Sequence, residues 1–158
     1  MRSPVFQSAG AAIWQGCYDE GWGSLITPES YAHPAKFARG LIERIIRHGI
    51  ERGYWVPGQD VLGDTFGGVA LGGIIAAYHG LAWIGVELES RFVVLGQANI
   101  DLHAAKLKAL GAPLPVIVQG DSRNFAEIVR GAAGICKIKL ISQSLAATIK
   151  TRKDGDDN

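Results

Sequence analysis

Long hydrophobic runs, cysteine and excess charge are all scarce in this sequence, and each scarcity excludes a class of protein. No apolar run approaches the ~20 residues that a membrane-spanning helix requires. The two cysteines, Cys17 and Cys136, lie far apart without metal-ligand spacing, so we expect reduced thiols rather than a disulfide framework. The net charge of +1 gives no global argument for binding nucleic acid or a membrane. Because a signal-peptide pattern is also missing, we expect a soluble, cytoplasmic protein.

The chain of 158 residues is long enough for one domain with a real core, and its composition changes along its length. Residues 1–33 are rich in Gly, Ser and Pro, which predicts an irregular segment held to the core by scattered aromatic side chains. Residues 34–141 alternate between helical and strand patterns. Residues 142–158 form a charged, divergent tail. The alternating part is the predicted domain.

Strand and helix patterns follow one another four times within the predicted domain. Helices are predicted from Pro34 to just before Gly53, over residues 69–80, over residues 91–110 with Ser90 as cap, and over residues 122–132 with Ser122 as cap. Strands are predicted over residues 60–64, 81–88, 114–121 and 134–142. This alternation predicts an α/β fold with right-handed crossovers and a parallel sheet. Ligands of such sheets bind at the carboxyl ends of the strands.

A glycine-rich turn, "DTFGGVALGG", begins at Asp64, where the first predicted strand ends. A phosphate-binding loop of the G-x-x-x-x-G-K-[ST] type is excluded because Gly73 occupies the lysine position. A dinucleotide fingerprint fits poorly, because Val69 stands where the second glycine is needed and Asp64 would repel a pyrophosphate. S-adenosylmethionine, which carries an ammonium and a sulfonium, is instead compatible with a carboxylate in front of the turn.

Acidic residues lie at the ends of the first three predicted strands. Asp64 can accept a hydrogen bond from the ammonium, Glu87 suits ribose hydroxyls, and Asp121 can accept from an adenine amino group. Two plainer explanations remain open at this point. Acidic residues after strands also serve as helix caps, which would explain Asp121, and Gly72 and Gly73 would also serve close packing of a helix on the sheet.

Four blocks, "AHPAKFARGLIERII", "DTFGGVALGG", "WIGVELESRFV" and "QGDSRNF", resemble the DNA methyltransferases that modify adenine N6 or cytosine N4, especially phage and prophage members. The resemblance covers about residues 33–129. It implies a Rossmann-like S-adenosylmethionine-dependent fold, here partial, with about four parallel strands in the order 3-2-1-4, and it implies DNA as a partner. It also implies that the following residues bind the cofactor: His33, Lys36, Phe37, Asp64, Thr65 (where proline is usual), Phe66, Gly67, Gly68, Glu87, Asp121 and Ser122.

The catalytic block of that family, [DNS]-P-P-[YFW], has no counterpart in the chain, which contains no Pro-Pro pair. No catalytic residue is therefore assigned. The interpretation is a truncated cofactor-binding half of a methyltransferase, or one subunit of a split enzyme whose partner chain supplies the missing block. The alternatives are a catalytically inactive binding module and a different nucleoside-binding enzyme on the same fold. The histidines His48, His79 and His103 have no metal-ligand spacing, so no metal is expected.

Overall fold

A computed structural model describes residues 14–33, 36–133 and 138–140. Within these residues two short 3-10 helices come first, η1 (Gly23–Leu25) and η2 (Pro28–Ala32). The remaining elements follow in the order α1 (Arg39–Glu51), β1 (Val61–Asp64), α2 (Leu71–Tyr78), β2 (Ala82–Glu87), α3 (Ser90–Ala109), β3 (Val116–Gln119), η3 (Ser122–Asn124), α4 (Phe125–Ala133) and β4 (Ile138–Leu140). The predicted tail, residues 142–158, lies outside the described residues, as do Pro34 and Cys136.

All pairings in the sheet are parallel, and the strands lie in the order β3-β2-β1-β4. The register places Asp64 at the end of β1 beside Gly85 of β2, and Glu87 at the end of β2 beside Gln119 of β3. The carboxyl ends of these three strands therefore meet at one edge of the sheet. The prediction of an α/β fold with a parallel sheet is confirmed.

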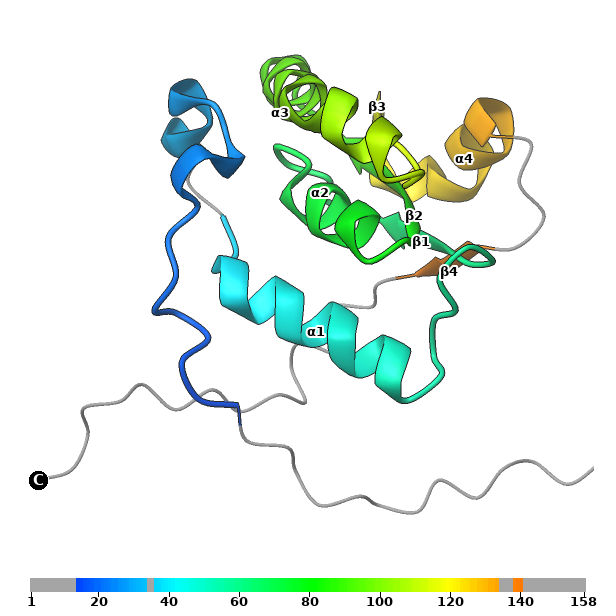
Figure 1. The fold of residues 1–158 in the computed structure, drawn as a ribbon. Helices are drawn as coiled ribbons and strands as arrows, with labels where there is room; N and C mark the ends of the chain where they lie inside the picture. The colour runs from blue at the N-terminus through cyan, green and yellow to red at the C-terminus, as the bar shows by residue number, and fades with distance from the viewer. Residues whose placement is uncertain (1–13, 34–35, 134–137, 141–158) are drawn as a thin grey trace, which may run out of the picture.

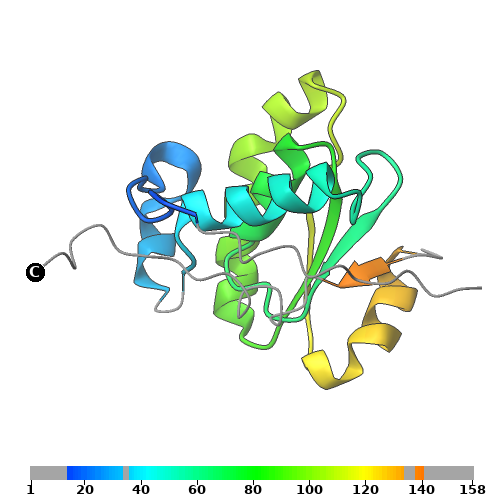
Figure 2. The ribbon, with the colours of Figure 1, turned by 90° about the horizontal axis from the view of Figure 1, so that it is seen from below.

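Helices cover both faces of the sheet (Figures 1 and 2). On one face, α2 and α3 pack on β2, α1 packs on α2, and Trp83, which is 1% exposed, belongs to the core that they form. On the other face, Phe125 and Val129 of α4 pack against Ile84 and Val86. Successive residues of β2 thus face opposite layers, which explains why this strand is apolar along almost its whole length. Among the described residues, no helix combines the length and the apolar character needed to cross a membrane.

Helix α1 begins at Arg39, so the prediction that it extends back to Pro34 is wrong for residues 36–38. The reason is a tertiary hydrogen bond. The indole Nε1 of Trp22 donates to the carbonyl oxygen of Phe37 at 3.0 Å, and Ala38, in an extended conformation, is the N-cap. A helix that began earlier would turn this carbonyl along the helix axis and away from Trp22, so the bond favours an extended chain before Arg39.

The caps predicted for the later helices are also displaced by one residue. Glu89, not Ser90, is the N-cap of α3, because its carbonyl oxygen accepts from the amides of Phe92 and Val93. Asp121, not Ser122, caps η3, since its side chain accepts from the amide of Arg123. A carboxylate at such a position also interacts favourably with the free amides of a helix start.

The N-terminal segment lies along α3, as the contacts of η1 and η2 with this helix show (Figure 1). Trp22 is 6% exposed, and Cys17 and Ile26 are also buried in the main core. The segment was predicted to be irregular, and residues 14–33 carry only the two 3-10 helices. Its aromatic residue Trp22 does anchor it to the core, through both burial and the bond to Phe37.

Candidate functional site

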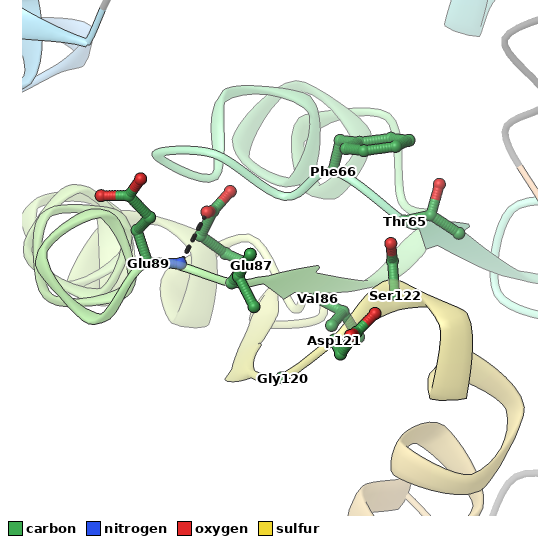
Figure 3. Close-up of a pocket in the computed structure, with 9 residues that line it drawn as sticks. Thr65, Phe66, Val86, Glu87, Glu89, Gly120, Asp121 and Ser122 are labelled. Carbon is green, nitrogen blue, oxygen red and sulfur yellow. Dashed lines mark hydrogen bonds between the residues drawn. The ribbon is translucent and has the colours of Figure 1, made fainter.

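A cavity of about 260 Å³ lies at the carboxyl ends of the first three strands (Figure 3). It is lined by residues 65–66 after β1, residues 86–89 at the end of β2, and residues 120–122 after β3. No lysine or arginine belongs to this lining, whereas three of its side chains are carboxylates. The position agrees with the general rule for ligand sites in parallel α/β sheets.

The glycine turn of residues 65–70 begins with a local hydrogen bond. Oδ1 of Asp64 accepts from the amide of Phe66 at 2.9 Å, which bends the chain away from β1. The amide of Gly67 then donates to the carbonyl oxygen of Val86 at 2.9 Å, so the turn reaches across to β2. A Cβ on Gly67 would lie 3.3 Å from Cα of Gly85, so the neighbouring strand is what approaches this backbone so closely.

Glycine occupies the later positions of the motif for different structural reasons. Gly68 has φ of +53°, a left-handed conformation that glycine adopts without strain. A Cβ on Gly73 would lie 2.6 Å from the ring of Trp83, so this position requires glycine for packing. At Gly72 a Cβ would meet Oδ2 of Asp64 and Nε1 of Trp83 at 3.6 Å, which is ordinary contact. The packing explanation is therefore confirmed for Gly73 only.

Glu87 connects the three strand ends. Its Oε2 accepts from the amide of Gly68 at 3.0 Å. Its Oε1 accepts from the amide of Glu89 at 2.9 Å, the bond drawn in Figure 3. Its backbone carbonyl accepts from the amide of Gly120 at 2.9 Å. Because a carboxylate has about four acceptor positions, Glu87 can still accept hydrogen bonds from a ligand on its cavity side.

The carboxyl group of Asp64 lies in an unfavourable environment for its charge. Burial raises its pKa above the usual value, the hydrogen bond from Phe66 opposes this, and the nearby charge of Glu87 raises the pKa further. Asp64 is thus near enough to Glu87 for the two charges to repel, although Asp64 itself does not belong to the cavity lining.

Asp121 has a structural role that its position in the sequence leaves open. Its Oδ1 accepts from the amide of Arg123 at 2.9 Å, and the guanidinium of Arg123 pairs with the same carboxylate. The side-chain hydrogen bond from Arg123 is the main cause that lowers the pKa of Asp121 to about 2. The helix-cap explanation is therefore correct for Asp121. Its side chain nevertheless lines the cavity together with Ser122.

The three residues of the first block take different places. The ring of His33 packs edge-on against Phe92, with centroids 4.2 Å apart, and its Cε1 lies 3.5 Å from the Cβ position of Gly68. His33 thus covers the glycine turn, and burial, its largest influence, lowers its pKa. Lys36 instead donates from Nζ to the carbonyl oxygens of Tyr31, at 2.7 Å, and His33. Phe37 is 53% exposed, and neither Lys36 nor Phe37 lines the cavity.

Sequence reasoning missed two features of the site, a pair of lining residues and two ion pairs. Leu88 and Glu89 also line the cavity; their signal is the run "ELES", which continues beyond the predicted strand end. Arg91 pairs with Glu89 and Arg123 pairs with Asp121, so Glu87 is the lining carboxylate without an ion pair in the described part of the chain. In both ion pairs the arginine lies two residues after the carboxylate, so the sequence spacing could have suggested them.

Metal binding has no support in the described ranges, where no group of three His, Cys, Asp or Glu side chains could hold an ion. No protein-family model matches the chain, and no curated protein matches its sequence. The chemistry of the cavity is therefore the basis for assigning a function.

Proposed function

We propose that this chain binds S-adenosylmethionine in the cavity at the ends of β1, β2 and β3, as the cofactor-binding part of an amino-methylating DNA methyltransferase. The parallel sheet supports a Rossmann-like methyltransferase fold of partial extent. The glycine turn after β1 and an acidic residue at the end of β2 support a nucleoside ligand. DNA as the partner rests on the sequence resemblance alone.

The observation that carries the proposal is Glu87, a carboxylate that lines the cavity without an arginine or lysine beside it and whose charge repels that of the nearby Asp64. The charge of Glu87 raises the pKa of Asp64, and the cavity lining contains no lysine, arginine or histidine. A ligand with an ammonium and a sulfonium would relieve this repulsion. A ligand with a pyrophosphate or triphosphate would increase it, which disfavours dinucleotides and nucleoside triphosphates.

The cavity suggests how the ligand would be oriented. Its volume of about 260 Å³ is slightly below the ~300–1,000 Å³ of common small-molecule sites, so we assign it to the adenosine part. Glu87 would accept from the ribose hydroxyls with its free lone pairs. Phe66 and Leu88, which are 63% and 66% exposed, offer apolar surface to the adenine ring at the cavity mouth. The methionine end would extend along the turn toward Asp64 and beneath His33.

Methyl transfer needs more than this site. An exocyclic amine is a poor nucleophile and has to be held in line with the methyl group, which the Pro-Pro-aromatic block does in the family that the sequence resembles. Because the sequence lacks that block, we propose that a partner chain or further residues supply it. The isolated chain would then bind the cofactor without transferring its methyl group.

Calorimetric titration with S-adenosylmethionine, S-adenosylhomocysteine and NAD tests the proposal. Saturable binding of the first two, and none of NAD, is the expected result; binding of NAD alone would indicate a different nucleoside enzyme. A second assay offers tritiated S-adenosylmethionine and unmethylated DNA to the isolated chain. Incorporation of label would show that the chain transfers the methyl group alone and would contradict the assignment of catalysis elsewhere.

A further inference from the structure

Asn99 is a polar side chain with no exposed surface in the middle of α3. Its Oδ1 accepts from the amide of Thr27 at 2.8 Å, and its Nδ2 donates to the carbonyl oxygen of Val69 at 2.9 Å. Nδ2 also donates to Oγ of Ser30 at 2.9 Å, and Ser30 is itself fully buried. One amide group therefore joins two segments that are far apart in the sequence.

The chemistry of the neighbours fixes the orientation of this amide. A backbone amide can only donate, so the atom that faces Thr27 is the carboxamide oxygen. A carbonyl oxygen can only accept, so the atom that faces Val69 is the nitrogen. The hydroxyl hydrogen of Ser30 can point to Oδ1 of Asn99 at 3.1 Å or to Oγ1 of Thr27 at 3.0 Å.

The first of the two segments is the strap, which we define as residues 22–33. The strap lies along α3 (Figure 1) and has a second attachment, where Nε2 of His103 lies 2.9 Å from the carbonyl oxygen of Leu25. It ends at His33, whose ring lies over Gly68. The second segment is the glycine turn, residues 65–70, which contains Val69. Asn99 thus holds the strap to the turn that His33 covers.

We propose that Asn99 is a positioning residue that couples the strap to the glycine turn, so that the strap acts as a lid over the methionine end of the site. Each hydrogen bond of the amide leaves a buried group without a partner when it breaks, so loss on one side weakens the other. Release of the strap removes His33 from Gly68 and loosens the turn. The ligand in this account rests on the proposed function; the coupling itself exists without ligand.

Amide hydrogen exchange in the ligand-free chain tests the coupling. Ser30→Ala removes a hydroxyl in the strap and touches no atom of the turn. The reporters are the amides of Gly67 and Ala70, which donate to Val86 and Gly67 and have no bond to Asn99. We expect their exchange to accelerate about tenfold, as befits the loss of a buried hydrogen-bond partner. Faster exchange of the Ser30 and His33 amides with unchanged exchange at Gly67 and Ala70 would overturn the proposal.

Two further variants complete the design. Gln97→Ala is the matched control, since Gln97 lies on the exposed face of α3 and its side chain donates to Asp101 on the same helix; it should leave the exchange of the reporter amides unchanged. Asn99→Asp keeps the acceptor for Thr27 but loses the donor to Val69, so we expect it to loosen the turn more than the strap. If the amides of Gly67 and Ala70 exchange at equal rates in Gln97→Ala and Ser30→Ala, the coupling is contradicted. This comparison does not depend on whether Asn99→Asp folds.

Binding of S-adenosylhomocysteine separates the lid from the ligand assignment. Under the proposal, Ser30→Ala weakens this affinity about tenfold, in proportion to the loosened turn, and Gln97→Ala does not. If Ser30→Ala loosens the turn and still binds with wild-type affinity, the strap is not a lid. If the wild-type chain shows the coupling but binds no S-adenosylhomocysteine, the coupling stands and the proposed function fails.

Discussion

Replacement of Glu87 by glutamine is the most informative single change at the site. Both carboxylate oxygens of Glu87 accept from backbone amides, those of Gly68 at 3.0 Å and Glu89 at 2.9 Å. A carboxamide has only one oxygen, so its NH₂ group must face one of these two donors. The oxygen will turn to the partly buried amide of Gly68, because water can reach the exposed amide of Glu89.

The size of the effect follows from these two bonds. The bond to Gly68 changes from charged to neutral, and charged hydrogen bonds contribute ~1.5–3 kcal/mol against ~0.5–1.5 kcal/mol for neutral ones. The bond to Glu89 is lost but replaced by water. Removal of this charge also relieves its repulsion with Asp64 and offsets part of the loss, so we expect Glu87→Gln to lower the free energy of unfolding by about 1 kcal/mol. For a chain of this size the melting temperature should fall by roughly 2–4 °C.

Glu89→Gln provides the matched control, because it removes the same charge from the same cavity. The side chain of Glu89 pairs with exposed Arg91, an arrangement worth ~0–1 kcal/mol. Thermal unfolding followed by circular dichroism should show a clear loss for Glu87→Gln and little change for Glu89→Gln. Calorimetry should show weaker S-adenosylhomocysteine binding for Glu87→Gln. Equal melting temperatures and equal affinities in the two variants would refute the assignment of Glu87 as the central residue of the site.

Four further substitutions have stability effects whose direction the structure predicts. Gly73→Ala should lower the melting temperature, since the added Cβ would lie 2.6 Å from Trp83, and overpacking costs ~1–3 kcal/mol. Gly131→Ala should raise it, because no atom lies within 4 Å of the added Cβ and alanine favours a helix over glycine. Asp64→Asn should raise the free energy of unfolding at pH 7, measured by urea titration, and should weaken ligand binding. Because burial raises the pKa of Asp64, this gain in stability should shrink as the pH falls toward 3.8, the usual pKa of an aspartate. A gain that stays constant down to pH 3 would contradict this account. Burial lowers the pKa of His33, so the free energy of unfolding of the wild type should decline as the pH falls below 6.5. That of His33→Gln should decline less over the same pH range. Parallel pH dependences of the two proteins would contradict this prediction.

The strands were predictable from the sequence because apolar runs such as "WIGV" are bounded by glycine and acidic residues. The start of α1 was not, because the bond from Trp22 to Phe37 joins residues whose proximity only the fold creates. Secondary-structure patterns report local preferences, and a tertiary hydrogen bond can override them at a helix end.

The site shows the same division. The placement of Thr65, Phe66 and Glu87 around one cavity followed from the rule that parallel strands end at one edge. The role of Asp121 could not be predicted, because a cap and a ligand-binding acid occupy the same position after a strand. Asn99 gave no signal at all, since a polar residue within a long helix pattern is usually exposed. Only the packing of the strap on α3 reveals its partners.

The most direct test of the central claim is the amide chemical-shift map of the wild-type chain titrated with S-adenosylhomocysteine. The account predicts saturable shifts concentrated at Gly67, Gly68, Leu88 and Ser122, around the ends of the three strands. A folded chain that shows no saturable shifts at millimolar ligand, or shifts on another surface, would contradict it.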